Sequence, residues 1–488
     1  MPVHFVYNFS REILSLLGGY TVPKYNLVTS DIISRLEQIV GSKNITTDPE
    51  KLELYSHDEE SDTQYHKMPE VVLFPETAQQ VSQILKLANS ELIPVVPRAA
   101  GTGLACAAVP IHGGIVLSVE KMNKILEVNT DSMYMVVEPG VRTDDIQAAA
   151  TAAGLFYAGD PCSGDSCFIG GNVATNAGGN RAVKYGTTRQ QVYELEMVTA
   201  QGDIVNLGGR LAKNSTGYNL EQLIIGSEGT LGVITKVTLK LAPQPKEVID
   251  LLGIFPDVDA AIGIVPKLIK AGVTPTSVEF MDNDTVKSVE HFLNEKLPHS
   301  DRGHYVLIQV EGINEEDLED KSVSIDELCN ENGAIEVLVG DPSKVWKWRK
   351  SYLEAARHEC LIMAKEDMVV PVDKIPEVMR VATQLNAKYG VQTRVAAHAG
   401  DGNVHLTILK GSIPDAEWEK TIYDYHHEVY KAVYAMGGKL SGEHGIGYKR
   451  KKLMHEFTNP VELAMMQAIK KALDPNLILN PGKIFDVE

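Results

Sequence analysis

The chain has 488 residues, of which 44% are hydrophobic and 23% charged, a composition typical of globular proteins that bury sizeable cores without disulfide bonds. Its 46 basic and 65 acidic residues give a formal net charge of −19, which disfavours nucleic acid and anionic membrane surfaces as partners. At this length we expect about two to four domains.

Five cysteines are spread along the chain without a CxxC pair. An odd, sparse set predicts reduced thiols with structural roles, and it disfavours disulfides and an iron–sulfur site. The first twenty residues lack a basic start, and Arg11 and Glu12 interrupt their apolar stretch, so no signal peptide is predicted. No run approaches the roughly 20 apolar residues of a membrane span. We therefore expect a cytoplasmic protein.

In chain order, residues 1–25 are predicted to be an N-terminal extension that ends in a linker at 20–24. A helix is predicted after Ser30, which can cap it, because apolar residues recur at helical spacing in DIISRLEQIV. Short strands and helices then alternate: strands at 71–74, 93–96, 115–119, 133–137 and 232–241, and helices at 77–89 and 143–153. Residues 192–207 alternate on both sides of Gln201-Gly202, which predicts a hairpin. We expect a first domain at 26–245, of α+β class with an open mixed sheet.

Beyond Pro243 and Pro245 the glycine density falls. Residues 246–455 show strands and long helices in a different rhythm and are predicted to form a second domain. A helix is predicted over 453–473, ended by Asp474-Pro475. Residues 456–488 form the C-terminal segment, which closes with the turn-rich sequence NPGKIF.

Three segments of the first domain are rich in small residues: PRAAGTGL at 97–104, GDPCSGDSCFIGGNVATNAGG at 159–179 and GSEGTLG at 226–232. Glycine lets backbone N–H groups approach an anion closely, and successive N–H groups form an anion-binding nest. A cofactor with a pyrophosphate suits such loops. GTGLAC at 101–106 lacks the third glycine of GxGxxG and no Walker sequence occurs, so we expect a nucleotide bound without the Rossmann fingerprint.

His398 and His405 frame the sequence HAGDGNVH in the second domain, and Glu443 follows in SGEHGIG. The histidines are seven residues apart, too far for one helical face, and the GDGN between them is turn sequence that leads to a predicted strand at 404–408. Two imidazoles and one carboxylate match an open catalytic metal site, because they leave positions free for water or substrate. Ser412 stands where an EF-hand loop requires its final glutamate, which argues against that loop.

These segments, with KNSTGYNL at 213–220 and the terminal NPGK, resemble the FAD-binding segments of the vanillyl-alcohol oxidase superfamily. Within it they resemble the branch of bacterial D-lactate dehydrogenases, glycolate oxidase catalytic subunits and D-2-hydroxyglutarate dehydrogenases, from about residue 30 to 488. The resemblance implies a two-subdomain FAD-binding fold, a ferredoxin-like α+β cap domain that carries the substrate and metal site, and a C-terminal segment that returns to the FAD domain. No histidine lies inside the first two glycine-rich loops, so non-covalent FAD is expected.

The resemblance also implies the residues that contact FAD. Those expected at the pyrophosphate are Arg98, Ala99, Ala100, Gly101, Thr102 and Gly103. Those expected near the flavin are Pro161, Ser166, Gly171, Asn172, Thr175, Gly178 and Ile234, with Asn480 closing the site.

HxGDGNxH and GEHG are the metal and catalytic motifs of this branch. The resemblance therefore supports a divalent metal on His398, His405 and Glu443, and zinc, iron(II) and manganese(II) all tolerate this ligand set. His444 is expected to be the general base that removes the hydroxyl proton of the substrate.

Arg349, in KVWKWRK, is the expected cation for the substrate carboxylate, since a guanidinium binds a carboxylate in bidentate fashion. Lys365 is a further catalytic candidate. Thr407 stands where the family often has asparagine two residues after the second motif histidine, which puts one substrate contact in doubt.

The expected activity is oxidation of a small 2-hydroxy acid, lactate first, to the 2-oxo acid, with the Cα hydrogen passing as hydride to flavin N5. D-2-Hydroxyglutarate and glycolate are alternative substrates. A non-catalytic FAD electron-transfer or scaffold subunit is the alternative from another class, which the full set of histidines and carboxylate disfavours. Oxygen, quinone, cytochrome and electron-transfer flavoprotein all stay open as acceptors, and the resemblance to electron-bifurcating lactate dehydrogenase assemblies favours electron-transfer flavoprotein subunits.

Overall fold

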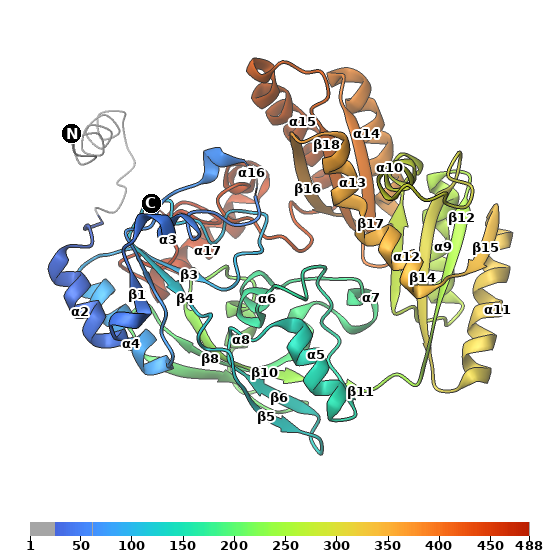
Figure 1. Ribbon diagram of the computed structural model, residues 1–488. Helices are drawn as coiled ribbons and strands as arrows, with labels where there is room; N and C mark the ends of the chain where they lie inside the picture. The colour runs from blue at the N-terminus through green and yellow to red at the C-terminus, as the bar shows by residue number, and fades with distance from the viewer. Residues whose placement is uncertain (1–24, 61, 488) are drawn as a thin grey trace.

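The computed structural model describes residues 25–60 and 62–487, which form two lobes (Figure 1). In Figure 1 the blue and green segments build one lobe, the yellow and orange segments build the other, and the red C-terminal helices lie beside the first. The predicted N-terminal extension at 1–25, with its linker at 20–24, lies outside the described residues except for Tyr25. Tyr25 is buried and its hydroxyl donates to the carbonyl oxygen of Leu477 at 2.7 Å, so it belongs to the folded lobe.

The first helix, α2 (Ser30–Val40), begins one residue earlier than its predicted cap implies. The cap is Thr29, whose side chain accepts a hydrogen bond from the N–H of Ile32. Ser30 is already helical, so its prediction as the cap is wrong. Serine and threonine both cap helices well, so the sequence alone does not tell which of the two adjacent residues is the cap.

Two main sheets and one two-stranded sheet build the first lobe, where the sequence predicted one open mixed sheet. One has the order β1-β2-β4-β3 and contains β1 (Ile45–Thr46), β2 (Val71–Leu73), β4 (Ile115–Ser118) and β3 (Val95–Arg98). The other has the order β5-β6-β10-β8-β9 and contains β5 (Ile125–Asn129), β6 (Tyr134–Val137), β10 (Val233–Lys240), β8 (Val192–Val198) and β9 (Ile204–Gly208). Each sheet packs on its own hydrophobic core, and local sequence patterns do not reveal which strands pair.

The predicted hairpin at 192–207 is confirmed. β8 and β9 pair antiparallel, with Val198 opposite Ile204. Gly202 in the turn has φ +84°, a left-handed conformation that glycine adopts without strain. The remaining elements of this lobe are α3 (Pro49–Glu53), α4 (Ala78–Ser90), α5 (Thr143–Ala152), β7 (Leu155–Phe156), α6 (Ile169–Thr175), α7 (Ala182–Tyr185), α8 (Leu220–Ile224) and β11 (Ala242–Pro243).

The second lobe is a seven-stranded antiparallel sheet in the order β15-β12-β14-β13-β17-β18-β16. Its strands are β12 (Glu247–Phe255), β13 (Ser277–Met281), β14 (His304–Gly312), β15 (Glu336–Val339), β16 (Met363–Val369), β17 (Gln392–His398) and β18 (Asn403–Leu409). The first four strands in chain order lie in the order 4-1-3-2, which is the ferredoxin-like arrangement. The other three strands, β16, β17 and β18, form a second unit of the same arrangement that lacks a full fourth strand. Pairing of β13 with β17 joins the two units into one sheet.

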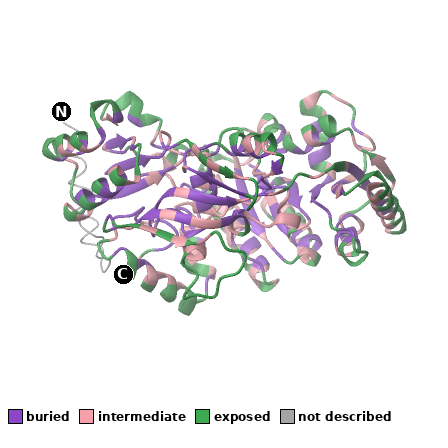
Figure 2. Ribbon diagram, turned by 90° about the horizontal axis from the view of Figure 1, so that it is seen from below, coloured by how far each residue is buried: buried purple, intermediate pink, exposed green. Residues whose placement is uncertain are grey.

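The two faces of this sheet have different environments. One face packs a large hydrophobic core against α9 (Val258–Lys270), α11 (Glu315–Glu331), α14 (Ile375–Tyr389) and α15 (Asp415–Ala435). The opposite face contacts α10 (Asn283–Leu293), α12 (Pro342–Lys350) and α13 (Tyr352–Glu359) over part of its area. Figure 2 shows the buried strands inside each lobe and the mixed exposure of the outer helices. Because side chains alternate along a strand, Lys365 and Asp367 of β16, His398 of β17 and His405 of β18 lie on the face opposite the large core.

The C-terminal segment contacts both lobes: its first helix packs against α15 and the large core of the second lobe, and the rest packs on the first lobe. The single helix predicted over 453–473 is wrong: α16 (Lys451–Phe457) ends before Pro460, and α17 (Pro460–Leu473) begins there with Asn459 as its cap. Proline lacks the N–H that a continuous helix needs. Leu479 then forms a parallel bridge with Val95 of β3. Among the described residues, none of the helices combines the length and hydropathy needed to cross a bilayer.

Candidate active site

A cavity of about 280 Å³ brings the glycine-rich loops of the first lobe together with Glu443 and His444. Several predicted FAD contacts line it, namely Arg98, Ala99, Ala100, Gly101, Thr102, Gly103, Pro161, Gly171, Asn172, Thr175 and Ile234. Three do not: Ser166, Gly178 and Asn480. Most of the predicted contacts therefore share one cavity, although their atoms come from loops far apart in the sequence.

The loop at 97–104 presents free backbone donors. Within the described part of the chain, the N–H groups of residues 100–104 donate no hydrogen bond. Arg98 turns away from them: its Nη1 donates to the carbonyl oxygen of His57 at 2.7 Å, and its guanidinium lies over the ring of Tyr55. Gly101 has φ +80°, and a side chain there would collide with Arg98. The free N–H groups of the loop can therefore donate hydrogen bonds to an anionic group, and the side chain of Arg98 packs against the loop at Gly101.

The three predicted contacts outside the lining have other partners. The hydroxyl of Ser166 donates to Asp165 at 2.9 Å. The amide of Asn480 donates to the carbonyl oxygens of Ala107 and Glu228, which cross-links the cavity wall. Gly178 lies against Glu443, because a Cβ at Gly178 would stand 2.6 Å from Glu443 Oε2.

Three imidazole nitrogens converge on one carboxylate oxygen. The Nε2 atoms of His398, His405 and His444 lie 3.5, 3.3 and 3.8 Å from Oε1 of Glu443. His398 ends β17, His405 lies on β18, and Glu443 and His444 occupy the loop after α15, so the antiparallel pairing of β17 with β18 brings the two motif histidines together. Separations of this size match those between ligands of one metal ion bound at about 2.0–2.2 Å.

Electrostatics favour a positive charge at this point. Burial alone would lower the pKa of His398, but the carboxylates of Glu279 and Glu443 outweigh it and raise the pKa well above its usual value. Burial likewise opposes ionisation of Glu443, yet His398 and His405 hold its pKa well below the ordinary range. The buried Nε2 of His398 has no hydrogen-bond partner among the described residues. This set of donors therefore fits a divalent cation, which would replace the protons.

Glu279, on β13, orients His398 from behind. Its Oε1 lies 2.8 Å from His398 Nδ1, and its Oε2 accepts a hydrogen bond from Nε of Arg349, also at 2.8 Å. All three side chains are buried. A carboxylate on Nδ1 fixes the imidazole tautomer and leaves Nε2 free to bind a metal. Arg349, the predicted substrate cation, is thus paired with Glu279, whose Oε2 lies 2.8 Å from both Nε and Nη2 of the guanidinium.

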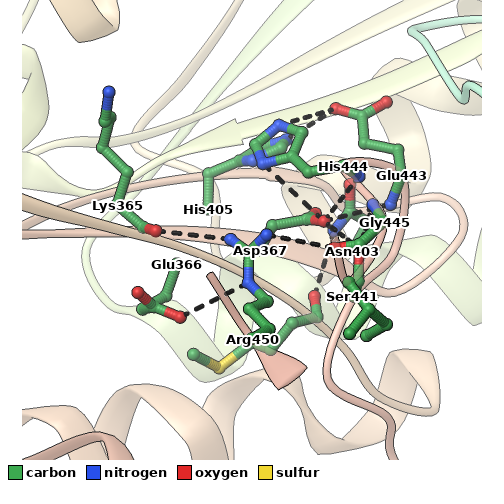
Figure 3. A network of polar contacts seen from close by, with 12 residues as sticks. Lys365, Glu366, Asp367, Asn403, His405, Ser441, Glu443, His444, Gly445 and Arg450 are labelled. Atoms are coloured by element: carbon green, nitrogen blue, oxygen red, sulfur yellow. Dashed lines mark hydrogen bonds and ion pairs between the residues drawn. The ribbon is translucent and has the colours of Figure 1, made fainter. Parts of the chain in front are cut away.

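Asp367, on β16, holds the loop that carries Glu443 and His444 (Figure 3). Its Oδ2 accepts hydrogen bonds from the hydroxyl of Ser441 and from the N–H groups of Glu443 and His444, at 2.6, 3.1 and 2.8 Å. Its Oδ1 accepts from the amide of Asn403 at 2.7 Å. Asp367 also belongs to a cluster whose ligand atoms lie within 4.8 Å of one another, with His405, Glu443 and His444. Because its oxygens are already engaged, we assign it to holding the loop.

The imidazole of His444 is neutral at neutral pH. Burial lowers its pKa to about 4 despite the nearby carboxylates of Asp367 and Glu443. Its Nδ1 lies 3.7 Å from Asp367 Oδ2 and makes no hydrogen bond within residues 25–60 and 62–487. At neutral pH such a ring carries a lone pair that can accept a proton.

Lys365 projects from the same face of β16 as Asp367. It is buried, its Nζ lies 3.6 Å from Glu60 Oε1, and this ammonium donates no hydrogen bond to any residue that the structure describes. Lys449 donates to the other oxygen of Glu60 at 2.6 Å. Opposite Lys365 on β18 stands Thr407, whose hydroxyl pairs with that of Tyr352 at 2.6 Å.

Four residues with contacts at this site were absent from the sequence-based candidates: Glu279, Asp367, Glu228 and Cys162. Glu279 is the single charge in the strand sequence SVEFM, and Asp367 lies in the charged run KED of β16; charged residues inside predicted strands are a signal that could have been noticed, since buried charges are seldom unpaired. Glu228 and Cys162 line the cavity. Cys162 was expected to be structural, and nothing in its short sequence context marks it as part of a cavity wall.

Comparisons with known proteins identify the family of the chain. Residues 69–208 match the family model of the FAD binding domain, and residues 244–484 match that of the C-terminal domain of FAD linked oxidases. The chain is 38% identical to a D-lactate dehydrogenase of Anaerostipes hadrus, over 94% of this chain and 98% of that protein. It is 35% identical to the glycolate oxidase subunit GlcD of Bacillus subtilis, over 94% and 97%. In structure it resembles p-cresol methylhydroxylase with a TM-score of 0.79 at 17% identity, over 93% and 96%, which shows a fold of the vanillyl-alcohol oxidase type.

Proposed function

The chain belongs to the family of FAD-linked oxidases, and from that premise we propose that it oxidises a small 2-hydroxy acid, lactate first, to the 2-oxo acid at a metal-assisted site. The observation that carries the proposal is the convergence of three imidazole nitrogens on Glu443 Oε1 at the wall of the cavity that fits FAD. The relatives named D-lactate dehydrogenase and glycolate oxidase subunit support the substrate class. A scaffold without chemistry would have no use for this set of buried donors.

His398, His405 and Glu443 are proposed to hold the metal, with Glu279 fixing His398 through Nδ1. The backbone N–H groups of residues 100–104 are proposed to hold the pyrophosphate of non-covalent FAD. When bound, FAD supplies the acceptor of the two electrons, and the metal, whether zinc, iron(II) or manganese(II), supplies a Lewis acid for the hydroxyl group.

The side chains of the protein then orient the substrate and move its proton. Nε2 of His444 accepts the hydroxyl proton, since its low pKa keeps the ring neutral before the reaction. The part of the Arg349 guanidinium that Glu279 leaves free is proposed to bind the substrate carboxylate. Lys365 adds a second positive charge, and its buried Nζ has no hydrogen-bond partner among the described residues.

The first prediction is that anaerobic addition of D- or L-lactate bleaches the flavin of the purified protein. Glycolate and D-2-hydroxyglutarate serve as the alternative substrates in the same series, and acid denaturation should release free FAD because no covalent bond is expected. A protein that carries FAD but whose flavin none of these acids reduces would refute the proposed reaction.

We further propose that electron-transfer flavoprotein subunits accept the electrons, in an arrangement that would permit electron bifurcation. The support is physical. All five cysteines are free, and the described residues contain no cysteine cluster suited to an iron–sulfur centre, so an onward relay would have to come from a partner.

Purification from the native cell under gentle conditions is therefore expected to bring down two further flavoprotein subunits, and lactate-dependent electron transfer should require them. Turnover of the isolated chain with oxygen at the rate of the native extract would contradict this second proposal and leave the first untouched.

A further inference from the structure

The loop that carries Glu443 and His444 is held between two buried carboxylates, one from each lobe. Asp367 holds it from the sheet of the second lobe, and Glu228 holds it from the first lobe. Five consecutive N–H groups donate to side-chain oxygens: Glu443 and His444 to Asp367, Gly445 to Ser441, and Ile446 and Gly447 to Glu228. The two bonds to Glu228 measure 2.8 and 2.7 Å, with one carboxylate oxygen for each donor.

Glu228 is itself fixed in the wall of the cavity. Its backbone has φ +52°, which is uncommon for a residue with a side chain. Its N–H donates to the carbonyl oxygen of Ala174 at 2.7 Å, and its own carbonyl oxygen accepts from the amide of Asn480 at 2.7 Å. The carboxylate therefore projects from a rigid part of the first lobe.

The loop packs closely against the first lobe at two glycines. A Cβ at Gly445 would stand 2.8 Å from Glu228 Oε1, and a Cβ at Gly447 would collide with the carbonyl oxygen of Ala105. The sequence GEHGIG thus combines a proposed metal ligand and base with two glycines, of which Gly445 packs against Glu228 and Gly447 against the backbone of Ala105. Both contacts are closer than a side chain at either position would allow, so the loop is held tightly on the first lobe.

We propose that Glu228 is a positioning residue: it fixes Glu443 and His444 at one distance from the part of the cavity that is assigned to the flavin. This inference rests on the proposed function, because the distance matters only if a hydrogen moves between a substrate at His444 and a bound flavin. Asp367 sets the loop against the histidines of the second lobe, and Glu228 sets it against the loops of the first. A displacement of about 1 Å at such a site can cost on the order of 100-fold in rate.

The test is Glu228→Gln in the full chain, with Asp250→Asn as the matched control. Glutamine has the shape of glutamate, but its NH₂ group would face one of the two N–H donors, at Ile446 or Gly447, and that hydrogen bond would be lost. Asp250 is an equally buried carboxylate on β12 that accepts from Gln309 and Trp346, away from the cavity. We expect Glu228→Gln to slow flavin reduction by lactate roughly 10- to 100-fold, with FAD and metal content and substrate affinity unchanged. Hydrogen exchange at residues 446 and 447 should accelerate, and Asp250→Asn should change neither quantity.

Gly445→Ala disturbs the same contact from the loop side and provides a second variant if Glu228→Gln does not fold. Flavin reduction at the wild-type rate, unchanged exchange at 446 and 447, or an equal loss in Asp250→Asn would overturn the inference. If the wild-type flavin is reduced by no 2-hydroxy acid while exchange at 446 and 447 still rises in Glu228→Gln, the contact stands and the proposed function fails instead.

Discussion

Replacing His444 by alanine is expected to lower the rate of hydroxy-acid oxidation by a factor on the order of 10²–10⁴, the usual contribution of a general base. Burial brings the pKa of His444 to about 4, whereas the pKa of His398 is raised. At neutral pH the His444 ring is therefore neutral and carries a lone pair that can accept a proton. Alanine removes the acceptor nitrogen and leaves His398, His405 and Glu443 in place.

The measurement is the rate of anaerobic flavin reduction at saturating substrate, with FAD and metal content determined on the same sample. His304→Ala is the matched control, since His304 is partly buried in the same lobe and its Nδ1 accepts only from the N–H of Asn283. A rate in His444→Ala close to that of the wild type would assign the proton to another group. Loss of the metal from His444→Ala would show instead that this residue is a ligand.

Much of the fold could be predicted because the elements are marked locally. Strands at 71–73, 115–118 and 233–240 and the hairpin at 192–208 carry apolar runs or alternation with a glycine turn, and these signals do not depend on distant residues. The division into two sheets could not be predicted, because β4 and β5 follow one another in sequence and yet pair with different partners. The break at Pro460 could have been predicted, since proline inside an apolar helical pattern ends a helix.

The residues of the candidate site that occur in short motifs could be predicted from the sequence. The residues that position those motifs in the fold could not. His398, His405 and Glu443 lie in glycine-rich sequences and converge as expected. Glu279 lies 119 residues before His398 and acts through a strand pairing that no local pattern encodes. For the same reason Arg349 could be read as a free cation from its sequence, although Glu279 engages it in the fold.

Removal of the central carboxylate, Glu443→Gln, is expected to abolish metal binding and with it hydroxy-acid oxidation, while FAD stays bound. Glu443 is the one anion among the three proposed ligands, and its Oε1 is the point that both ligand imidazoles face. An amide retains the shape but offers a neutral oxygen, so the cation would sit among groups of no net charge. Chelation of the wild type should have the same effect.

Glu279→Gln provides the graded comparison, because Glu279 holds His398 without facing the metal position. Loss of such a partner is expected to weaken metal binding by about 10- to 100-fold, or about 1.4–2.7 kcal/mol. Affinity is measured by competition with a chelator of known strength, metal per FAD by elemental analysis, and Asp250→Asn again serves as the buried-carboxylate control. Full turnover of Glu443→Gln with its metal removed would refute the metal assignment. An unchanged metal affinity in Glu279→Gln would refute only the orienting role of Glu279, because His398 would then bind equally well without its carboxylate partner.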